Sequence, residues 1–524
     1  MKRNATIAAL VLCLVLALIV IFIPKARELN LADTEISQET WDKIVSTHIK
    51  NRWLTLGDAT FNGNELQLDS DGDRYFYSIA PSDENAYSPT IYIPDGNRVN
   101  IATLSPTISY ESIAENRPVK MLLYTDLEYR VMELVATTLP TMNINTKWHP
   151  NITEDDSNAA VRLYDNMAAP DKRVTTSNTR IHLRGSTSIH QEKKSYKLNL
   201  TDADGANRHL SLLGMRKDDD WILNNLYADY EKIRNILATQ LWRDCCTEHN
   251  EMQAPNSFEY RFVELFIDNS YAGLYLLGYK PDKKTANLNG YEYTFKNNDW
   301  ANAEVLAETD NFSRYFAFDS GEVDESEAEA ELREYIDTIA FGTAEEIRAM
   351  FDIENAIDIE LHGMITQDVD YTKDDKTKNL FWTMKNSPTR RAIMFTPWDF
   401  DLSFGNAWRD HMENMSSAES YASPTDTVIL TDQMPTGALR KLGDAEIEAE
   451  VRARYKELRD DAWSDEKIFA LVDRYERRIF QSGAYYRDQA RWPKGNFLEG
   501  ATDLSVFRDY LRERLQFVDE FYGY

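Results

Sequence analysis

Two aspartates set among aromatic residues constrain the fold of this chain more than any other feature. Asp399 and Asp401 follow the apolar run 392–395, which is typical of a buried strand. Aromatic side chains surround the pair at three positions, Trp398, Phe400 and Phe404. A carboxylate in such surroundings is costly to desolvate unless a lysine, an arginine or a metal ion meets it. Mg²⁺ prefers carboxylate oxygens and commonly bridges them to phosphate, so the run predicts a metal–phosphate site.

The composition excludes several classes of function. The 524 residues are sufficient for two or three domains with a large core. The net charge is -29, from 87 acidic and 58 basic side chains, which argues against a nucleic-acid partner. The same charge means that local cations must hold any anionic substrate. The three cysteines, Cys13 and the adjacent Cys245 and Cys246, have neither the spacing of a disulfide framework nor that of a zinc site.

A long apolar segment lies near the N-terminus. Residues 7–23 carry no charge, Lys2 and Arg3 precede them, and Lys25 and Arg27 follow. This pattern is typical of a signal peptide or a transmembrane anchor. Because no small-x-small cleavage signal follows, we expect residues 1–27 to form an uncleaved helix through the cell membrane, with the rest of the chain outside the cytoplasm. A secreted protein is the alternative.

After this segment the sequence predicts a β-rich domain and then a larger mixed domain. In residues 28–137, short alternating runs such as 74–79 and 90–93 are separated by Asp-Gly and Asn-Gly turn signals, which predicts a small all-β domain of sandwich type. The remainder, 138–524, alternates between the two kinds of element. We expect strands at 159–164, 180–183, 195–200, 262–267, 273–277, 380–384 and 392–395, and helices at 230–245, 325–340, 344–350, 357–367 and within 445–522. The predicted class is α+β.

A predicted hairpin carries a candidate phosphate-binding lysine. Arg184 and Gly185 open a turn rich in glycine and serine, and the following strand contains Lys197. Alternation along that strand places Lys197 on the face opposite to Tyr196 and Leu198. A hairpin of this kind is suited to cover a phosphate group. The alternative is an amphipathic edge strand with a solvated lysine.

A second motif has the spacing of a protein-kinase catalytic loop. Asp374 and Asn379 are separated by four residues, as are the aspartate that takes the substrate hydroxyl proton and the asparagine that holds metal in that loop. The spacing alone is weak, and a charged surface turn explains it as well.

Taken together and in this order, the motifs resemble those of the CotH family, the spore-coat protein H kinase-like proteins. The resemblance covers residues 138–524. The residues that carry it are Leu139-Pro140 with Asn143-Ile144, Arg184-Gly185 and Ser188 with Lys194, Tyr196 and Lys197, Trp221 and Leu223 with Tyr227-Ala228-Asp229 and Ile233-Arg234-Asn235, Val263–Ile267 with Tyr271, Gly273 and Tyr275–Leu277, Lys378-Asn379, and Pro397–Gly405.

The resemblance implies an atypical two-lobed kinase-like fold that binds ATP and Mg²⁺. By this analogy Lys197 and Arg184 hold the nucleotide, Asn379 contacts both nucleotide and metal, and Asp399 is the principal metal ligand. Asp401 is expected to support Asp399, either as a further metal ligand or by positioning Asp399 without contacting the metal. Two positions compete for the catalytic aspartate. Counting back from Asn379 selects Asp374, whereas counting forward from the helix that ends near residue 367 selects Asp370.

Three functions are compatible with the sequence. The first is an anchored protein kinase that transfers the γ-phosphoryl group of ATP to Ser or Thr hydroxyls of proteins at the cell surface or in a spore coat. The second is a catalytically inactive surface or spore-coat scaffold. The third is a metal-dependent hydrolase built on the same aspartates.

Overall fold

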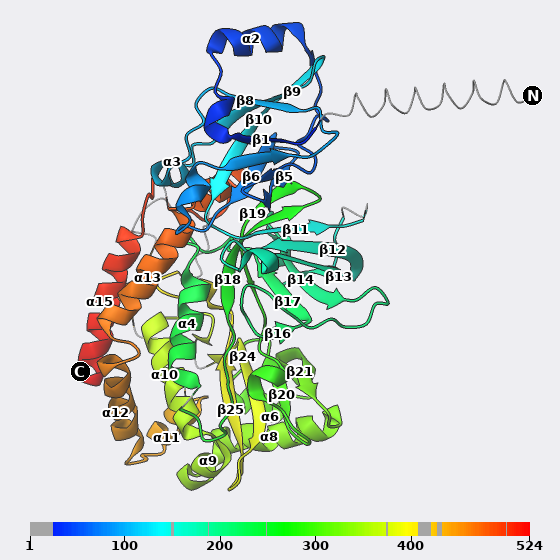
Figure 1. The fold of residues 1–524 in the computed structure, drawn as a ribbon. Helices are drawn as coiled ribbons and strands as arrows, with labels where there is room; N and C mark the ends of the chain where they lie inside the picture. The colour runs from blue at the N-terminus through cyan, green and yellow to red at the C-terminus, as the bar shows by residue number, and fades with distance from the viewer. Residues whose placement is uncertain are drawn as a thin grey trace, which may run out of the picture.

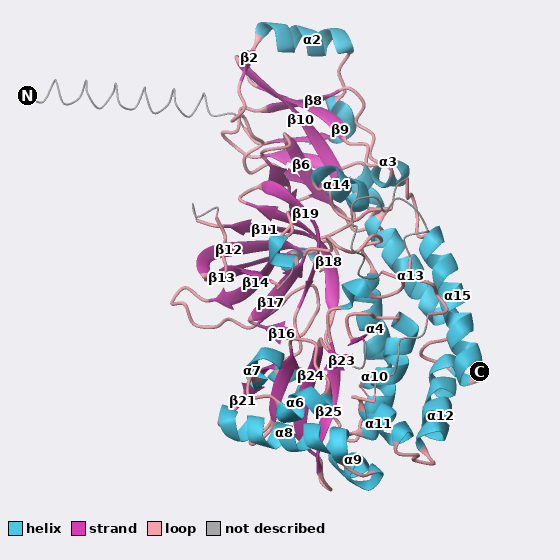
Figure 2. Cartoon of the chain, turned by 180° about the vertical axis from the view of Figure 1, so that it is seen from behind, coloured by secondary structure: helices cyan, strands magenta, loops and turns pink. Residues whose placement is uncertain are grey.

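The computed structural model describes residues 25–147, 151–186, 188–247, 249–373, 376–406, 421–426, 432–498 and 500–524. The fold is α+β, as expected: three β-rich parts follow one another along the molecule, and long helices line one side (Figures 1 and 2). The expected anchor at 7–23 lies outside the described residues. Within the described part, no helix is both long and apolar enough to cross a membrane.

The N-terminal part has two sheets that share one core. The first has the order β1 (Arg27–Asn30), β7 (Thr90–Ile93), β3 (Thr60–Phe61) and β4 (Asn64–Glu65). The second has the order β5 (Gln67–Asp69), β6 (Arg74–Ser78), β10 (Glu128–Thr137), β9 (Val119–Tyr124) and β8 (Asn100–Thr103), with β2 (Ile49–Lys50) beside β10. Phe61 and Ile91 of the first sheet and Tyr77 and Met121 of the second belong to the same buried cluster. Helices α2 (Gln38–Thr47) and α3 (Tyr110–Ala114) add to this part, so it is not built from strands alone.

The central part is a closed barrel. Its strands follow the order β11 (Thr141–Asn145), β12 (Ser157–Tyr164), β13 (Val174–Arg184), β14 (Ser195–Thr201), β17 (Asp220–Asn224), β19 (Ser270–Gly278) and β18 (Tyr260–Ile267). The parallel pairing of β18 with β11 closes it. Leu198 and Leu200 are fully buried while Lys197, on the opposite face of the strand, is not, as the alternation along β14 predicts. The short strands β15 (Leu210–Ser211) and β16 (Lys217–Asp218) pair beside it.

The third β-rich part is a sheet of order β21 (Phe316–Gly321), β20 (Tyr293–Asn297), β24 (Leu380–Asn386) and β25 (Arg391–Pro397). The chain between β20 and β24 contains the helices α6 (Ala303–Glu308), α7 (Phe312–Tyr315), α8 (Glu325–Phe341) and α9 (Ala344–Met350), followed by α10 (Ile353–Thr366). The hairpin β24–β25 and helices α8 and α9 confirm their predicted positions, whereas β20 and β21 were not foreseen. The small hairpin β22 (Thr372–Lys373) and β23 (Lys376–Thr377) precedes β24.

On the remaining side, α4 (Arg234–Cys246) packs against α10, and several of the other helices contact one of the two. The others are α5 (Lys283–Ala286), α11 (Pro435–Lys441), α12 (Ile447–Asp460), α13 (Asp465–Ile479), α14 (Ala484–Arg491) and α15 (Ser505–Tyr522). Helix α4 begins four residues later than predicted because Lys232 has a left-handed backbone, with φ 61°. Helix α10 begins four residues earlier, where the carboxylate of Asp352 accepts from the N–H of Asn355.

A buried ion pair joins the helical layer, the barrel and the N-terminal part. Arg487 of α14 donates to both oxygens of Glu264 on β18, and Thr137 of β10 donates to the same carboxylate. Glu264 therefore has a structural role, and the N-terminal part is fixed to the barrel.

Candidate active site

The predicted motif residues converge because of a hairpin. The register of β24 and β25 pairs Leu380 with Pro397, so Asn379 and Asp399, which flank that pair, lie at the same end. Helix α10 ends close by, at Thr366, and the acidic loop that follows it contains Asp368 and Asp370. The order along the chain is helix, acidic loop, asparagine, hairpin and aspartate.

Asp370 is the aspartate that contacts Asn379. The Asn379 amide donates to its carboxylate at 2.7 Å, and the ammonium of Lys378 lies 3.1 Å from the same oxygen. Only 5% of the surface of Asp370 and 6% of that of Asn379 is exposed, so the three side chains form a shielded cluster. Asp374, the alternative from spacing, lies outside the described residues.

The loop that carries Asp399 is held in a strained conformation from two sides. Asp399, Asn379 and Phe404 have positive φ angles of 70°, 58° and 48°. Aspartate and asparagine tolerate that region, but an aromatic residue there is strained, and such strain persists only where the surroundings enforce it. Asn235 of α4 accepts from the N–H of Phe400 at 2.9 Å, and the carbonyl of Thr366 at the end of α10 accepts from the N–H of Phe404.

Arg234, the first residue of α4, fixes the same loop from within. It is fully buried, its Nε donates to the carbonyl of Ser403 at 2.9 Å, and its Nη1 donates to Asp229 at 2.8 Å and to Glu231. Asp229 also accepts from the N–H of Arg234 at 2.7 Å, which satisfies a free donor at the start of the helix. Asp229 and Arg234 therefore have structural roles at the start of α4.

The site carries more negative charge than its surroundings balance. Burial raises the pKa of Asp368, and the charge of Asp370 raises it further. Loss of hydration likewise raises the pKa of Asp401, with Asp399 and Asp370 adding to the effect. One carboxylate oxygen of Asp368 has no hydrogen-bond partner among the described residues. Buried carboxylates without a partner fit a hard cation, and the donor set of carboxylate and amide oxygens fits Mg²⁺.

The predicted aromatic surroundings are present. Trp398, Phe400 and Phe404 are all buried, at 4%, 1% and 0% exposure. The ring of Phe258 lies 5.1 Å from that of Trp398 and 6.3 Å from that of Phe400. Arg184 of β13 places its guanidinium 5.7 Å from the centre of the Trp398 ring, so this predicted residue lies beside the aspartate motif.

A cation that the sequence analysis missed faces the same site. Lys296 of β20 is largely buried, which lowers its pKa, while Asp399 opposes the shift and Arg184 and Lys280 add to it. Lys280 in turn pairs with Asp319 of β21. The sequence signal for Lys296 was its position close to Tyr293, Phe295 and Asn297. Because no strand was predicted there, the sequence did not indicate which face the Lys296 side chain would occupy.

Lys197 pairs with an aspartate outside the cluster around Asp399. Its ammonium lies 3.6 Å from the carboxylate of Asp220 on the adjacent strand β17, and 28% of its side chain is exposed. Burial raises the pKa of Asp220, and Lys197 opposes this. The strand register places Lys197 opposite His182, two residues before Arg184, so Lys197 and Arg184 both stand on the hairpin predicted to cover a phosphate.

One further acidic group is already neutralised. His209, Asp218 and Asp219 bring donor atoms within 4.8 Å of one another, and in the described part of the chain no other set of three such residues does so. Asp218 accepts from Lys284 and Arg216, which occupy the positions that a cation would take. The aspartates around Asp399 are more widely spread and would have to draw together around an ion.

The order of helix, acidic loop, asparagine, hairpin and aspartate defines the site of a kinase-like protein. The chain belongs to the CotH family: a family model described as "CotH kinase protein" matches residues 181–518. The match includes Lys197, Asn379 and Asp399 and begins inside β13. Strands β11 and β12 lie before it, but they complete the same barrel and therefore belong to the same structural unit. A search of curated proteins finds no match.

Proposed function

We propose that this protein is an ATP-dependent protein kinase of the CotH type. The observation that carries the proposal is the contact of Asp370 with Asn379 at the end of the hairpin that also presents Asp399. A catalytic base and two metal-binding side chains in this relation are the parts that phosphoryl transfer requires.

Each acidic residue then has a role set by its surroundings. Asp370 accepts the proton of the attacking hydroxyl, and the Lys378 ammonium beside it balances charge on the transferred group. Asp399 and Asn379 hold Mg²⁺, supported by Asp401. When bound, Mg²⁺ neutralises charge on the phosphates and orients them.

Cations from two elements around the aspartate site would hold the triphosphate. Arg184 and Lys197 approach from the barrel hairpin, and Lys296 approaches from β20. On a chain with a net charge of -29, ATP is repelled at long range, so such a local cluster is needed for binding. Lys197 must exchange its contact with Asp220 for a phosphate, or share it.

The substrate and location follow from family resemblance alone. We propose protein Ser and Thr hydroxyls as acceptors, at the cell surface or in a spore coat, with the chain attached to the membrane through residues 1–27. A secreted form is the alternative.

The test is incorporation of label from γ-labelled ATP with Mg²⁺ into the full-length chain or a supplied acceptor protein. Asp399→Asn is expected to reduce incorporation by about a thousandfold, because the carboxylate that would hold Mg²⁺ at the phosphates is lost. Asp370→Asn and Asp374→Asn, compared side by side, identify the base. Asp42→Asn on the exposed face of α2 is the matched control. Incorporation that survives Asp399→Asn would remove the role given to that residue.

A second candidate is a scaffold that binds nucleotide without transfer. The ion pair of Lys378 with Asp370 favours it, since that pair occupies the carboxylate that a base must keep available. This candidate predicts binding of Mg-ATP with no labelled protein under any condition. Release of free phosphate with no labelled protein would instead indicate a hydrolase.

A further inference from the structure

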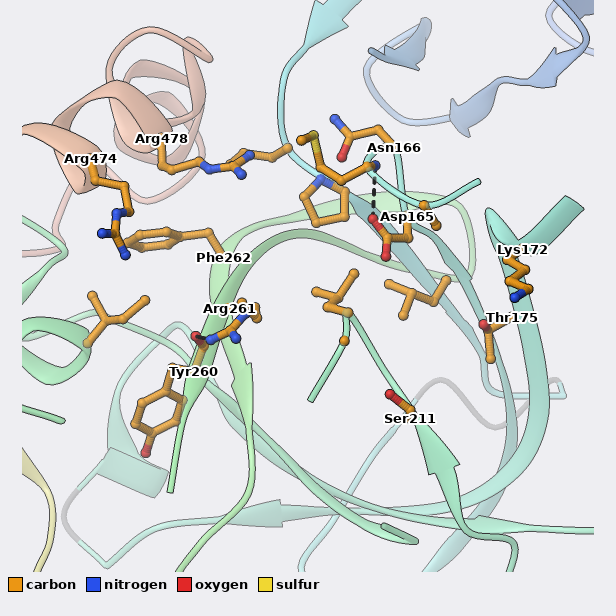
Figure 3. A pocket seen from close by; sticks show the side chains of 18 of the residues that line it. Asp165, Asn166, Lys172, Thr175, Ser211, Tyr260, Arg261, Phe262, Arg474 and Arg478 are labelled. Carbon is orange, nitrogen blue, oxygen red and sulfur yellow. Dashed lines mark hydrogen bonds between the residues drawn. The ribbon is translucent and has the colours of Figure 1, made fainter. Parts of the chain in front are cut away.

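A large cavity lies between the barrel and helix α13, apart from the aspartate site (Figure 3). Its volume is about 870 Å³, within the range of small-molecule pockets. Much of its wall is apolar, formed by Leu139, Leu163, Leu213, Ile236 and Phe262. It is therefore roomy enough for a molecule of metabolite size that has an apolar face.

Cationic side chains outnumber acidic ones in this wall. Arg474 and Arg478 come from α13, Arg261 comes from β18, and Lys172 lies at the opposite end, whereas Asp165 is the one carboxylate among the lining residues described. Figure 3 shows Arg478 extending from α13 into the cavity, across from Asp165. On a chain with so large an acidic excess, a local surplus of arginine is unexpected for a face that only meets water.

Within the described chain, the two α13 arginines of the cavity wall have acidic neighbours, Asp244 for Arg474 and Asp165 for Arg478, but no carboxylate in direct contact. Neither Arg474 nor Arg478 forms an ion pair there, and the hydrogen bond that Arg478 makes to protein is to the carbonyl of Thr138, at 3.3 Å. Arg261 pairs with Glu259, which lies outside the cavity wall. Arg474 and Arg478 are four residues apart on one helix, and like charges at that spacing repel. Burial lowers the pKa of Arg478, Asp165 opposes the shift, and Arg261 and Arg474 lower the pKa further.

A buried acceptor in the same wall also lacks a partner. The amide nitrogen of Asn166 donates to the carbonyls of Ile79 and Thr138, at 2.6 and 3.0 Å, so the identity of its two amide atoms is fixed. Its oxygen, on a residue only 2% exposed, has no donor among the described residues. Buried acceptors rarely lack a hydrogen bond, and a ligand hydroxyl would donate one to this oxygen.

We propose that this cavity binds a hydroxylated organic anion, with a phosphate or carboxylate held by Arg474, Arg478 and Arg261 and a hydroxyl donated to Asn166. Guanidinium groups bind either oxyanion through paired N–H donors, which makes arginine the suitable side chain for both. The phosphate and carboxylate forms share this chemistry, and the experiment separates them. The proposal does not depend on phosphoryl transfer.

The test is calorimetric titration of the full-length chain with three probes of one size: glucose 6-phosphate, glucuronate and neutral glucose. At least one of the two anions is expected to bind saturably, and glucose is not. Hexyl phosphate, which has no hydroxyl, is expected to bind more weakly than glucose 6-phosphate. The proposal is overturned if neither anion binds saturably up to about 10 mM. A weaker dissociation constant corresponds to a binding free energy too small for a specific site.

Variants locate the binding. The double variant Arg474→Gln/Arg478→Gln is expected to weaken the anion at least about tenfold. Arg477→Gln removes one positive charge from the same helix outside the cavity wall and is expected to have no effect. Asp399→Asn is expected to leave binding unchanged. Equal weakening by Arg477→Gln, or loss with Asp399→Asn, would assign the binding to general charge or to the aspartate site and contradict the proposal. Unfolding midpoints of all variants establish that each is folded.

Discussion

The aspartate site and the arginine cavity lie along the same helix and have unbalanced charge of opposite sign. Arg234 and Asn235 at the start of α4 fix the Asp399 loop, while Ile236 and Gln240 of the same helix line the cavity. The first site has carboxylates without enough cations, and the second has more guanidinium groups than carboxylates. An imbalance of charge in a partly enclosed space indicates what kind of ligand is missing.

Burial of charge alone does not mark a binding site. Arg234, Arg487 and Arg514 are almost wholly buried, but each is satisfied: by Asp229 and Glu231, by Glu264, and by the carbonyls of Met364 and Pro424 respectively. These arginines hold the fold together. Arg474 is exposed and Arg478 half-buried, and both line a cavity without an ion pair among the described residues, which is the difference that suggests binding.

The largest effect on stability is expected for Arg234, the buried arginine of the aspartate site whose charge is paired. Arg234→Met leaves Asp229 and Glu231 as unpaired buried carboxylates, which costs about 3–5 kcal/mol of unfolding free energy. Urea unfolding measures the change. Arg512→Met, which breaks an exposed pair with Asp509 on α15, is the control and should change little. Equal effects of the two variants would contradict the distinction between buried and exposed partners.

The next effect separates the two sites by ligand. A ligand that binds only the folded chain stabilises it by about 2.7 kcal/mol at a hundred times its dissociation constant, so Mg-ATP is expected to raise the unfolding temperature. Asp399→Asn should abolish the rise, and Arg474→Gln/Arg478→Gln should leave it intact. The absence of any rise over a wide ATP range would favour a role without nucleotide.

A smaller effect tests the packing of α4 against α10, which positions both ends of the Asp399 loop. The ring nitrogen Nε2 of His362 lies 2.8 Å from the carbonyl of Ala238, and burial lowers the pKa of His362 from 6.5 to about 4. A depressed pKa contributes stability above pH 6.5 that is lost as the pH falls toward 4. Between about pH 7.5 and pH 5, the unfolding free energy of the unmodified chain should therefore fall by about 2 kcal/mol more than that of His362→Gln. Parallel stability–pH curves would show that His362 does not titrate as described.

The smallest effect tests the charge surplus of the cavity directly. Without an organic anion, Arg474→Gln removes a repulsion with Arg478 one turn away and should stabilise the chain by about 0.3 kcal/mol. Thermal unfolding in phosphate-free buffer measures it, with Arg477→Gln as reference. A clear loss of stability would mean that Arg474 has a stabilising partner and that the cavity is already balanced.

Local sequence patterns were sufficient for most elements of the fold. Helix α9 begins and ends where predicted, and the hairpin β24–β25 follows from two apolar runs separated by a polar turn. The α+β class was predicted correctly for the same reason, since periodicity and turn residues act over a few residues. Strands β20 and β21 were missed because their neighbours on both sides are helical and their apolar runs are short.

The sequence by itself determined which residues have chemistry to offer: Asp399 and Asp401 among aromatic rings, Asn379 before a strand, and Lys197 on the outer face of another. The tertiary structure decided how they are grouped. It placed Asp370 against Asn379, gave Lys197 the partner Asp220, and brought Lys296 from an unforeseen strand toward Asp399. It also closed the barrel and set Arg261 near Arg474 and Arg478. The physical reason is that charge balance depends on distances between residues far apart in the chain, which spacing along the sequence does not contain.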